Sequence, residues 1–70
     1  MAKQVEWYGD TKCDVCHREI GKELYDAKTK FGGWATMCQS CYISMGMGIG
    51  TGLGQKYEKQ PDGKYVKVKG

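Results

Sequence analysis

The sequence lacks any long apolar run. Its most apolar stretch, residues 42–53, is interrupted by glycine at every second position from Gly46, whereas a membrane-spanning helix needs about 20 consecutive apolar residues. The first four residues lead into mixed polar sequence and not into the apolar stretch of a secretory signal. We therefore expect no membrane-spanning helix, no membrane partner, no export, and a cytoplasmic location.

Patterns that carry catalysis are also missing. The only histidine, His17, has no serine, aspartate or cysteine nucleophile with which it obviously pairs. The glycines of residues 46–54 match neither the dinucleotide-binding pattern nor a phosphate loop, since no Gly-Lys-Ser/Thr ending follows them. The sequence therefore predicts no enzyme and indicates no small-molecule substrate.

Excess positive charge is absent from most of the chain. Residues 1–54 carry six basic and six acidic side chains, so the net charge of +3 comes entirely from residues 55–70. A zinc ion bound by four thiolates adds four negative and two positive charges, which leaves a net charge of about +1. The electrostatic attraction of the whole molecule for nucleic acid is therefore expected to be weak.

Four cysteines can compensate for the small hydrophobic core of so short a chain. Seventy residues bury only roughly 60% of the surface that the unfolded chain exposes. The cysteines form two doublets, Cys13 with Cys16 and Cys38 with Cys41, each with two residues between its members. Two such turns provide four soft anionic ligands for a tetrahedral zinc ion. With no export signal, metal binding is favoured over disulfides, and a structural zinc contributes on the order of 10–16 kcal/mol.

Other uses of the four thiols are less consistent with the sequence. In rubredoxin-type iron sites the doublets typically continue into glycine, whereas His17 and Tyr42 follow them here. A catalytic zinc keeps one coordination position open, and four thiolates leave none. His17 could replace a cysteine at the metal or act as a general base, but with the metal already satisfied we expect it beside the site or facing solvent.

The periodicity predicts one α+β domain spanning residues 1–70, with its zinc site in residues 13–41. Extended patterns predict a strand at 3–8, a hairpin with strands at 22–27 and 34–37, and a C-terminal hairpin with strands at 55–59 and 64–69. A short helix is expected at 42–45, because glycine from Gly46 onward disfavours its continuation. This order fits a zinc-ribbon or treble-clef-like fold.

Two segments are candidates for binding a partner. The glycine-alternating segment 46–54 is apolar and could be extended, with Met47, Ile49, Thr51 and Leu53 on one side, or helical, or a flexible connector. The lysine-rich C-terminal hairpin could follow a phosphate backbone with its tyrosines stacked on bases, or be a solvated strand edge. The candidate residues are Met47, Ile49, Leu53, Lys56, Tyr57, Lys64, Tyr65 and Lys67. A protein partner is favoured, with nucleic acid as the alternative.

Three strings carry a family resemblance. They are Cys-Asp-x-Cys at 13–16, Gly-Trp-Ala-x-Met-Cys-x-x-Cys at 33–41, and Gly-x-Gly-x-Gly-x-Gly-Gln-x-Tyr at 48–57. The chain resembles a group of small zinc-finger proteins encoded by phages and prophages, over residues 13–68. The resemblance implies a phage origin, a zinc-ribbon or treble-clef-like fold and the four cysteine ligands, and it implies no function.

Overall fold

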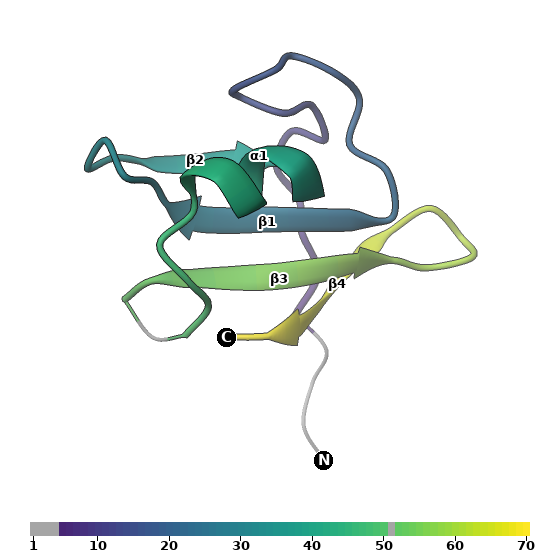
Figure 1. Ribbon diagram of the computed structural model, residues 1–70. Helices are drawn as coiled ribbons and strands as arrows, with labels where there is room; N and C mark the ends of the chain where they lie inside the picture. Colours follow the sequence, from purple (N-terminus) through teal and green to yellow (C-terminus); the bar gives the residue numbers. More distant parts are fainter. Residues whose placement is uncertain (1–4, 51) are drawn as a thin grey trace.

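The protein is a small α+β domain in which one short helix lies against a four-stranded antiparallel sheet. The computed structural model describes residues 5–50 and 52–70. In chain order the elements are β1 (Glu23–Lys28), β2 (Trp34–Met37), α1 (Gln39–Met45), β3 (Gly54–Lys59) and β4 (Tyr65–Lys69). The strand order is β2-β1-β3-β4, and α1 lies over β1 and β2 (Figure 1). Both predicted hairpins are confirmed.

The hairpin of β1 and β2 connects the two cysteine doublets. Its turn is held by Thr29, whose hydroxyl donates to the Gly33 carbonyl over 2.9 Å and accepts from the Phe31 amide over 3.3 Å. Gly32 has a φ of 96°, a conformation that glycine adopts without steric cost. This turn reverses the chain so that Met37, next to Cys38, pairs with Tyr25 at the start of the hairpin.

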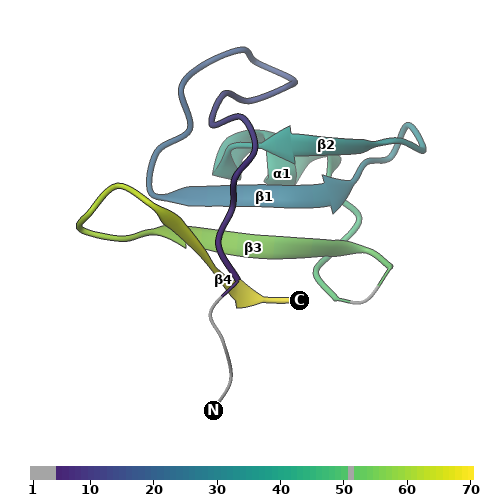
Figure 2. The same cartoon turned by 180° about the vertical axis from the view of Figure 1, so that it is seen from behind.

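The predicted N-terminal strand is present only as a short pairing with β4. Glu6 bridges Val66, the Trp7 amide donates to the Tyr65 carbonyl over 2.9 Å, and the Lys67 amide donates to the Val5 carbonyl over 2.7 Å. The segment then crosses the sheet face opposite α1 (Figure 2). Residues 3 and 4 of the predicted strand lie outside the described residues.

The core uses both faces of the sheet. Leu24 and Tyr57 pair on the face that the N-terminal segment crosses, where the Trp7 and Tyr57 rings have centroids 5.3 Å apart. Tyr25 and Met37 pair on the face under α1. The most buried apolar residues are Cys13, Ile20, Leu24, Tyr25, Ala27, Met37, Tyr57, Tyr65 and Val66. Since alternate residues of a strand point to opposite faces, β1 is buried on both sides.

Two tyrosines assigned to base stacking are core residues. Tyr57 and Tyr65 are each only 4% exposed, so neither ring is free to stack on a base. The Tyr65 hydroxyl donates to the carbonyls of Ile20 and Gly21, over 2.9 and 2.6 Å. The hypothesis of base stacking by the tyrosines of the C-terminal hairpin is therefore wrong, because Trp7 packs on Tyr57 and the Ile20–Gly21 segment covers Tyr65.

The glycine-alternating segment is an irregular loop packed against the end of β1. The Met47 amide donates to the Lys28 carbonyl over 3.0 Å, and the Lys28 amide donates to the Leu53 carbonyl over 2.8 Å. Its glycines 48, 50 and 52 have φ values of 126°, 140° and 80°, which side chains disfavour. The segment is neither a regular helix nor a one-sided extended chain, and Thr51 lies outside the described residues.

Candidate metal centre

The first doublet lies on a tight loop between residues 11 and 20. The Cys13 amide donates to the Arg18 carbonyl over 2.8 Å, and the Ile20 amide donates to the Thr11 carbonyl over 2.9 Å. Within the loop, the Cys16 amide points at the Cys13 sulfur over 3.5 Å. The turn therefore directs both thiols to the same side and offers a backbone donor to one of them.

The second doublet begins α1. Cys38 is the N-cap residue, with φ −77° and ψ 169°, and Cys41 lies in the first turn. The predicted helix at 42–45 thus begins earlier, at Gln39. Sequence reasoning placed the start too late, because it assigned the whole doublet to a turn although a helix also brings residues three apart to one face.

The four sulfurs form one cluster. The Sγ atoms of Cys13, Cys16, Cys38 and Cys41 all lie within 4.8 Å of one another. The Cys16 and Cys38 sulfurs are 3.8 Å apart, which excludes a disulfide at about 2.05 Å. A tetrahedral zinc with Zn–S bonds of about 2.3 Å separates its sulfurs by about 3.8 Å. The four predicted ligands therefore meet in a cluster of the size that a tetrahedral metal ion requires.

Charge in the cluster is unevenly distributed when no metal is bound. Burial of Cys13 by itself raises its pKa, but backbone N–H groups of Cys16, Cys38 and Val15 point at its sulfur and together lower the pKa to about 6. Burial, followed by hydrogen bonding to the other three sulfurs, raises the pKa of Cys41 to about 12. The Cys13 thiolate thus forms readily, while the Cys41 thiol needs a cation to replace its proton.

Asp14 attaches the first doublet to the hairpin. Its amide donates to the Thr36 carbonyl over 2.8 Å, and its carboxylate accepts from the Thr36 amide over 2.9 Å. Thr36 belongs to the edge strand β2, one residue before Met37. These two bonds hold the loop of Cys13 and Cys16 beside the strand that leads directly into Cys38.

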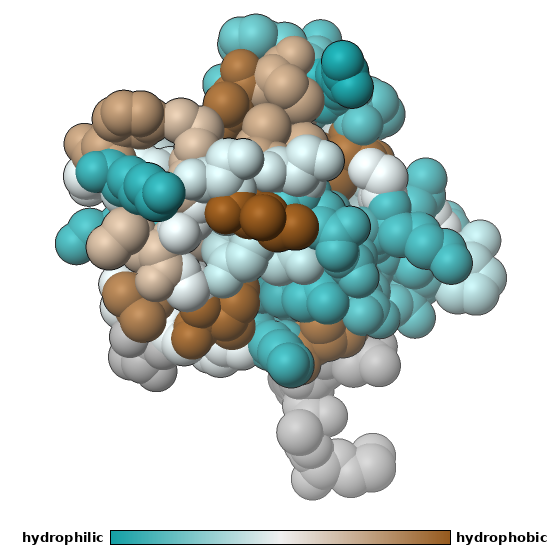
Figure 3. Space-filling model, viewed as in Figure 1, coloured by the Kyte–Doolittle hydropathy of each residue, from teal (hydrophilic) through white to brown (hydrophobic). Residues whose placement is uncertain are grey.

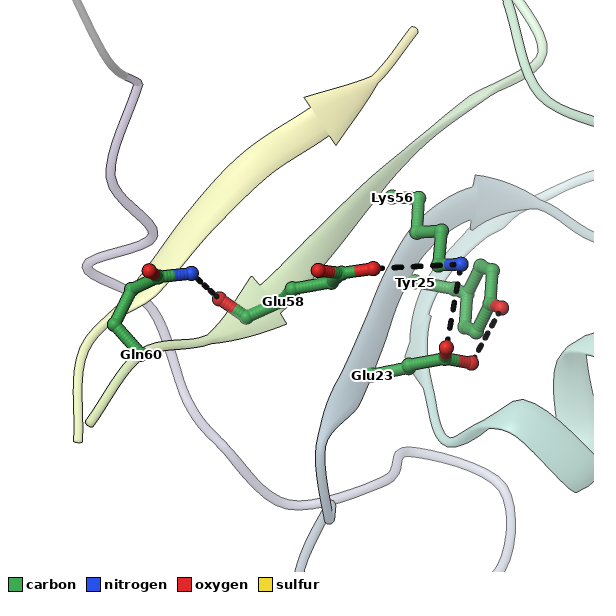
Figure 4. Close-up of polar contacts among 5 residues, drawn as sticks. All are labelled: Glu23, Tyr25, Lys56, Glu58 and Gln60. Carbon is green, nitrogen blue, oxygen red and sulfur yellow. Dashed lines mark hydrogen bonds and ion pairs between the residues drawn. The ribbon is translucent and has the colours of Figure 1, made fainter.

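An aromatic stack attaches the second doublet to the sheet. The rings of Tyr25 on β1 and Tyr42 on α1 lie 4.1 Å apart with an interplanar angle of 6°. The Tyr25 hydroxyl donates to Glu23 over 3.1 Å, and Lys56 pairs with Glu23 at 3.3 Å and with Glu58 at 3.9 Å (Figure 4). The Lys56 ammonium is 5.8 Å from the Tyr25 ring centroid. Lys56, a predicted partner contact, is thus engaged in holding this stack.

His17 faces solvent and is outside the sulfur cluster. It has a φ of 64°, the left-handed conformation, and its amide donates to the Cys13 carbonyl over 2.9 Å. Histidine is one of the side chains that tolerate this conformation better than most. The residue after the first doublet therefore has the left-handed conformation that glycine favours, but it is a histidine.

The remaining partner candidates are dispersed. Met47 and Leu53 are 50% and 40% exposed, whereas Ile49 is half-buried against the core. Lys64 is largely exposed and lies 3.8 Å from Glu6, and Lys67 is half-buried on β4. The structure therefore brings together the four metal ligands. Of the eight proposed partner contacts, it keeps Met47 and Leu53 near each other at the end of β1 and separates them from the candidates on β3 and β4.

Known proteins provide no identification. No family model, curated protein or solved structure matches this chain. Within the described residues, no helix has the length and apolar character needed to cross a membrane.

Proposed function

We propose that this chain is a structural zinc module of treble-clef-like type whose role is to bind a partner protein. The observation that carries the metal assignment is the cluster of four sulfurs within 4.8 Å. The order of loop, hairpin and helix supports the treble-clef comparison, because the first pair of ligands comes from a loop and the second pair from the start of α1.

Zinc is the proposed ion and its role is structural. Four thiolates are a ligand set that zinc shares with iron, and they leave no open position for a substrate. Residues that follow the doublets, His17 and Tyr42, differ from the glycines typical of rubredoxin-type sites. In the reducing cytoplasm of an infected host, which the resemblance to phage proteins implies, these thiols stay available to metal.

Exposed apolar side chains within the glycine segment favour a protein partner. Met47 and Leu53 remain 50% and 40% exposed, although their segment is fixed by backbone hydrogen bonds to Lys28. Exposed apolar side chains indicate a contact site when they form a contiguous patch of a few hundred Å². The nucleic-acid alternative is weakened, because burial of Tyr57 and Tyr65 removes the stacking surface from the lysine-rich hairpin.

Metal analysis tests the zinc assignment. We expect about one zinc per chain in purified protein, and loss of near-ultraviolet circular dichroism when a chelator removes it, because the metal is part of the folding free energy. Red colour with a charge-transfer band in protein purified without added metal would indicate iron. Retention of the native spectrum after complete metal removal would contradict a structural role.

Salt dependence tests the choice of partner. Binding of the zinc-loaded protein to single-stranded and duplex oligonucleotides should be weak, and capture of a partner protein should survive nuclease treatment. Nucleic-acid affinity falls steeply with salt as counterions are released, whereas apolar contact changes little. Tight oligonucleotide binding with a steep salt slope would overturn the protein-binding proposal.

A further inference from the structure

Four exposed apolar side chains lie at one end of the molecule and form what we call the hairpin-end patch. Its members are Phe31, Trp34, Met47 and Leu53, which are 80%, 50%, 50% and 40% exposed. They come from the β1–β2 turn, the start of β2 and the segment 46–54. In Figure 3 tan and brown residues gather at this end, whereas the end at the β3–β4 turn is mainly teal.

Hydrogen bonds around Lys28 hold the patch together. Lys28 lies directly opposite Trp34 in the sheet. Its carbonyl accepts from the Met47 amide over 3.0 Å, and its amide donates to the Leu53 carbonyl over 2.8 Å. Three members of the patch thus surround one backbone position. The turn that carries Phe31 is joined to the end of α1, because the Lys30 amide donates to the Met45 carbonyl over 2.8 Å.

Lys28 and Lys30 carry positive charge at this end of the molecule, and no salt bridge among the described residues uses either of them. Residues 27–57 contain no aspartate or glutamate. Lys28, the last residue of β1, and Lys30, in the turn that carries Phe31, both have exposed side chains. The nearest acidic residue along β1 is Asp26, which is half-buried. A ligand that covers the apolar side chains therefore also meets the ammonium groups of Lys28 and Lys30.

We propose that the hairpin-end patch docks a short acidic peptide segment of a partner protein. Apolar side chains of the segment cover Phe31 and Trp34, and its carboxylates pair with Lys28 and Lys30. This inference rests on the proposed function, for which it supplies the surface and the chemical class of the partner.

Size and charge favour a peptide segment over other occupants. With side chains of about 150–250 Å² each, the exposed parts of the patch sum to roughly 400 Å², which is about half of what one partner contributes to a standard protein interface. A second copy of the chain would bring like charges together across a two-fold axis. Bases could stack on Phe31 and Trp34, but Met47 and Leu53 offer no aromatic surface, which disfavours single-stranded nucleic acid.

A displayed library of random peptides of about 12 residues, selected on the immobilised zinc-loaded protein, tests the inference. We expect enriched peptides to combine aspartate or glutamate with aromatic or leucine residues. Phe31→Ser and Trp34→Ser should each weaken binding of a selected peptide by about tenfold or more. Replacing Lys28 and Lys30 together by alanine should weaken it several-fold and flatten its salt dependence.

Matched variants separate docking from folding. Tyr8→Ser removes an aromatic side chain that is 86% exposed on the N-terminal segment and should leave peptide affinity unchanged. Asp26→Asn removes the acidic group two residues before Lys28 on β1 and should strengthen binding. Zinc content near one per chain shows that each variant retains the metal centre.

Each contrary outcome identifies what fails. Enriched peptides that lack acidic residues, or that bind Phe31→Ser and Trp34→Ser normally, would overturn this inference and leave protein binding intact. No enrichment at all would also overturn the inference. Binding of oligothymidine of about 15 nucleotides that is lost in the same two variants would assign the patch to nucleic acid and overturn the proposed function as well.

Discussion

Asp14 and Thr36 are joined by two hydrogen bonds, although 22 positions separate them in the chain. Asp14 lies between the ligands Cys13 and Cys16, and Thr36 lies two residues before the ligand Cys38. The pair therefore joins the two halves of the metal centre without using the metal. It also covers backbone groups of the edge strand β2, which would otherwise be open to pairing with another chain.

Asp14→Ala should weaken both folding and zinc binding. The Thr36 amide loses a charged acceptor 2.9 Å away, and for a bond near the surface this costs about 1 kcal/mol. A loss of that size corresponds to a several-fold decrease in zinc affinity. Competition with a chromophoric chelator measures it, and Asp14→Asn, which keeps an acceptor oxygen, should retain most of the affinity. An unchanged affinity in Asp14→Ala would show that the pair does not support the centre.

His17→Gly and His17→Ala should differ in stability although both remove the imidazole. The left-handed backbone at His17, with φ 64°, costs a residue with a Cβ about 1–2 kcal/mol, and glycine avoids this cost. We expect the glycine variant to be more stable than the alanine variant by about 1 kcal/mol in urea unfolding of the zinc-loaded protein. If the imidazole were a ligand, both variants would instead lose zinc affinity equally.

Gly54→Ala should destabilise the protein, whereas Gly21→Ala should not. A Cβ at Gly54 would lie 2.5 Å from the Ala27 Cβ and 2.8 Å from the Gly48 carbonyl oxygen. Overpacking of this kind costs about 1–3 kcal/mol. At Gly21 no atom lies within 4 Å of the added Cβ, which makes it a matched control for the loss of glycine freedom. Equal unfolding midpoints in the two variants would contradict the packing of segment 46–54 on β1.

Asp26→Asn should stabilise the folded protein near pH 7. Burial raises the pKa of Asp26 in the folded state, so the ionised carboxylate opposes folding at pH values above that pKa. The penalty shrinks as pH falls through the raised pKa and is absent below the ordinary value of about 3.9, where both states are protonated. The gain should be below about 1 kcal/mol, because solvent screens a half-buried group.

Urea unfolding of zinc-loaded protein, from pH 7.5 down to the lowest pH at which zinc stays bound, measures the effect of Asp26→Asn. Asp10→Asn, at an exposed position, controls for the change in net charge. A gain that grows on acidification would contradict the assigned direction of the pKa.

Several elements were predictable because their signals are local. The turn residues and alternating patterns placed both hairpins within about one residue of β1 to β4. The start of α1 was missed by three residues, since the N-cap residue, Cys38, makes no side-chain capping hydrogen bond and cysteine is not among the usual N-cap residues. The stack of Tyr25 on Tyr42 was missed altogether, because it depends on where the helix lies over the sheet.

Burial was the least predictable property. The sequence made Tyr65 a candidate for partner contact, which requires an exposed ring, but its hydroxyl reaches the Ile20 and Gly21 carbonyls, more than 40 positions away in the chain. The glycine segment was correctly identified as unusual. The sequence did not decide between an extended, a helical and a flexible segment, and the close approach of Gly54 to Ala27 was not predicted. Alternation shows that a strand has two faces, and it does not show that another segment covers the second one.

The sequence by itself determined the ligand set, because four thiols at doublet spacing converge through local turn geometry and need only one reversal of the chain to meet. The tertiary structure alone decided which side chains remain free to bind a partner. It buried Tyr57 and Tyr65, engaged Lys56 with Glu23, and left Phe31 and Trp34 exposed. The physical reason is that burial depends on contacts between segments distant in sequence, whereas the cysteine turns depend on neighbours within a few residues.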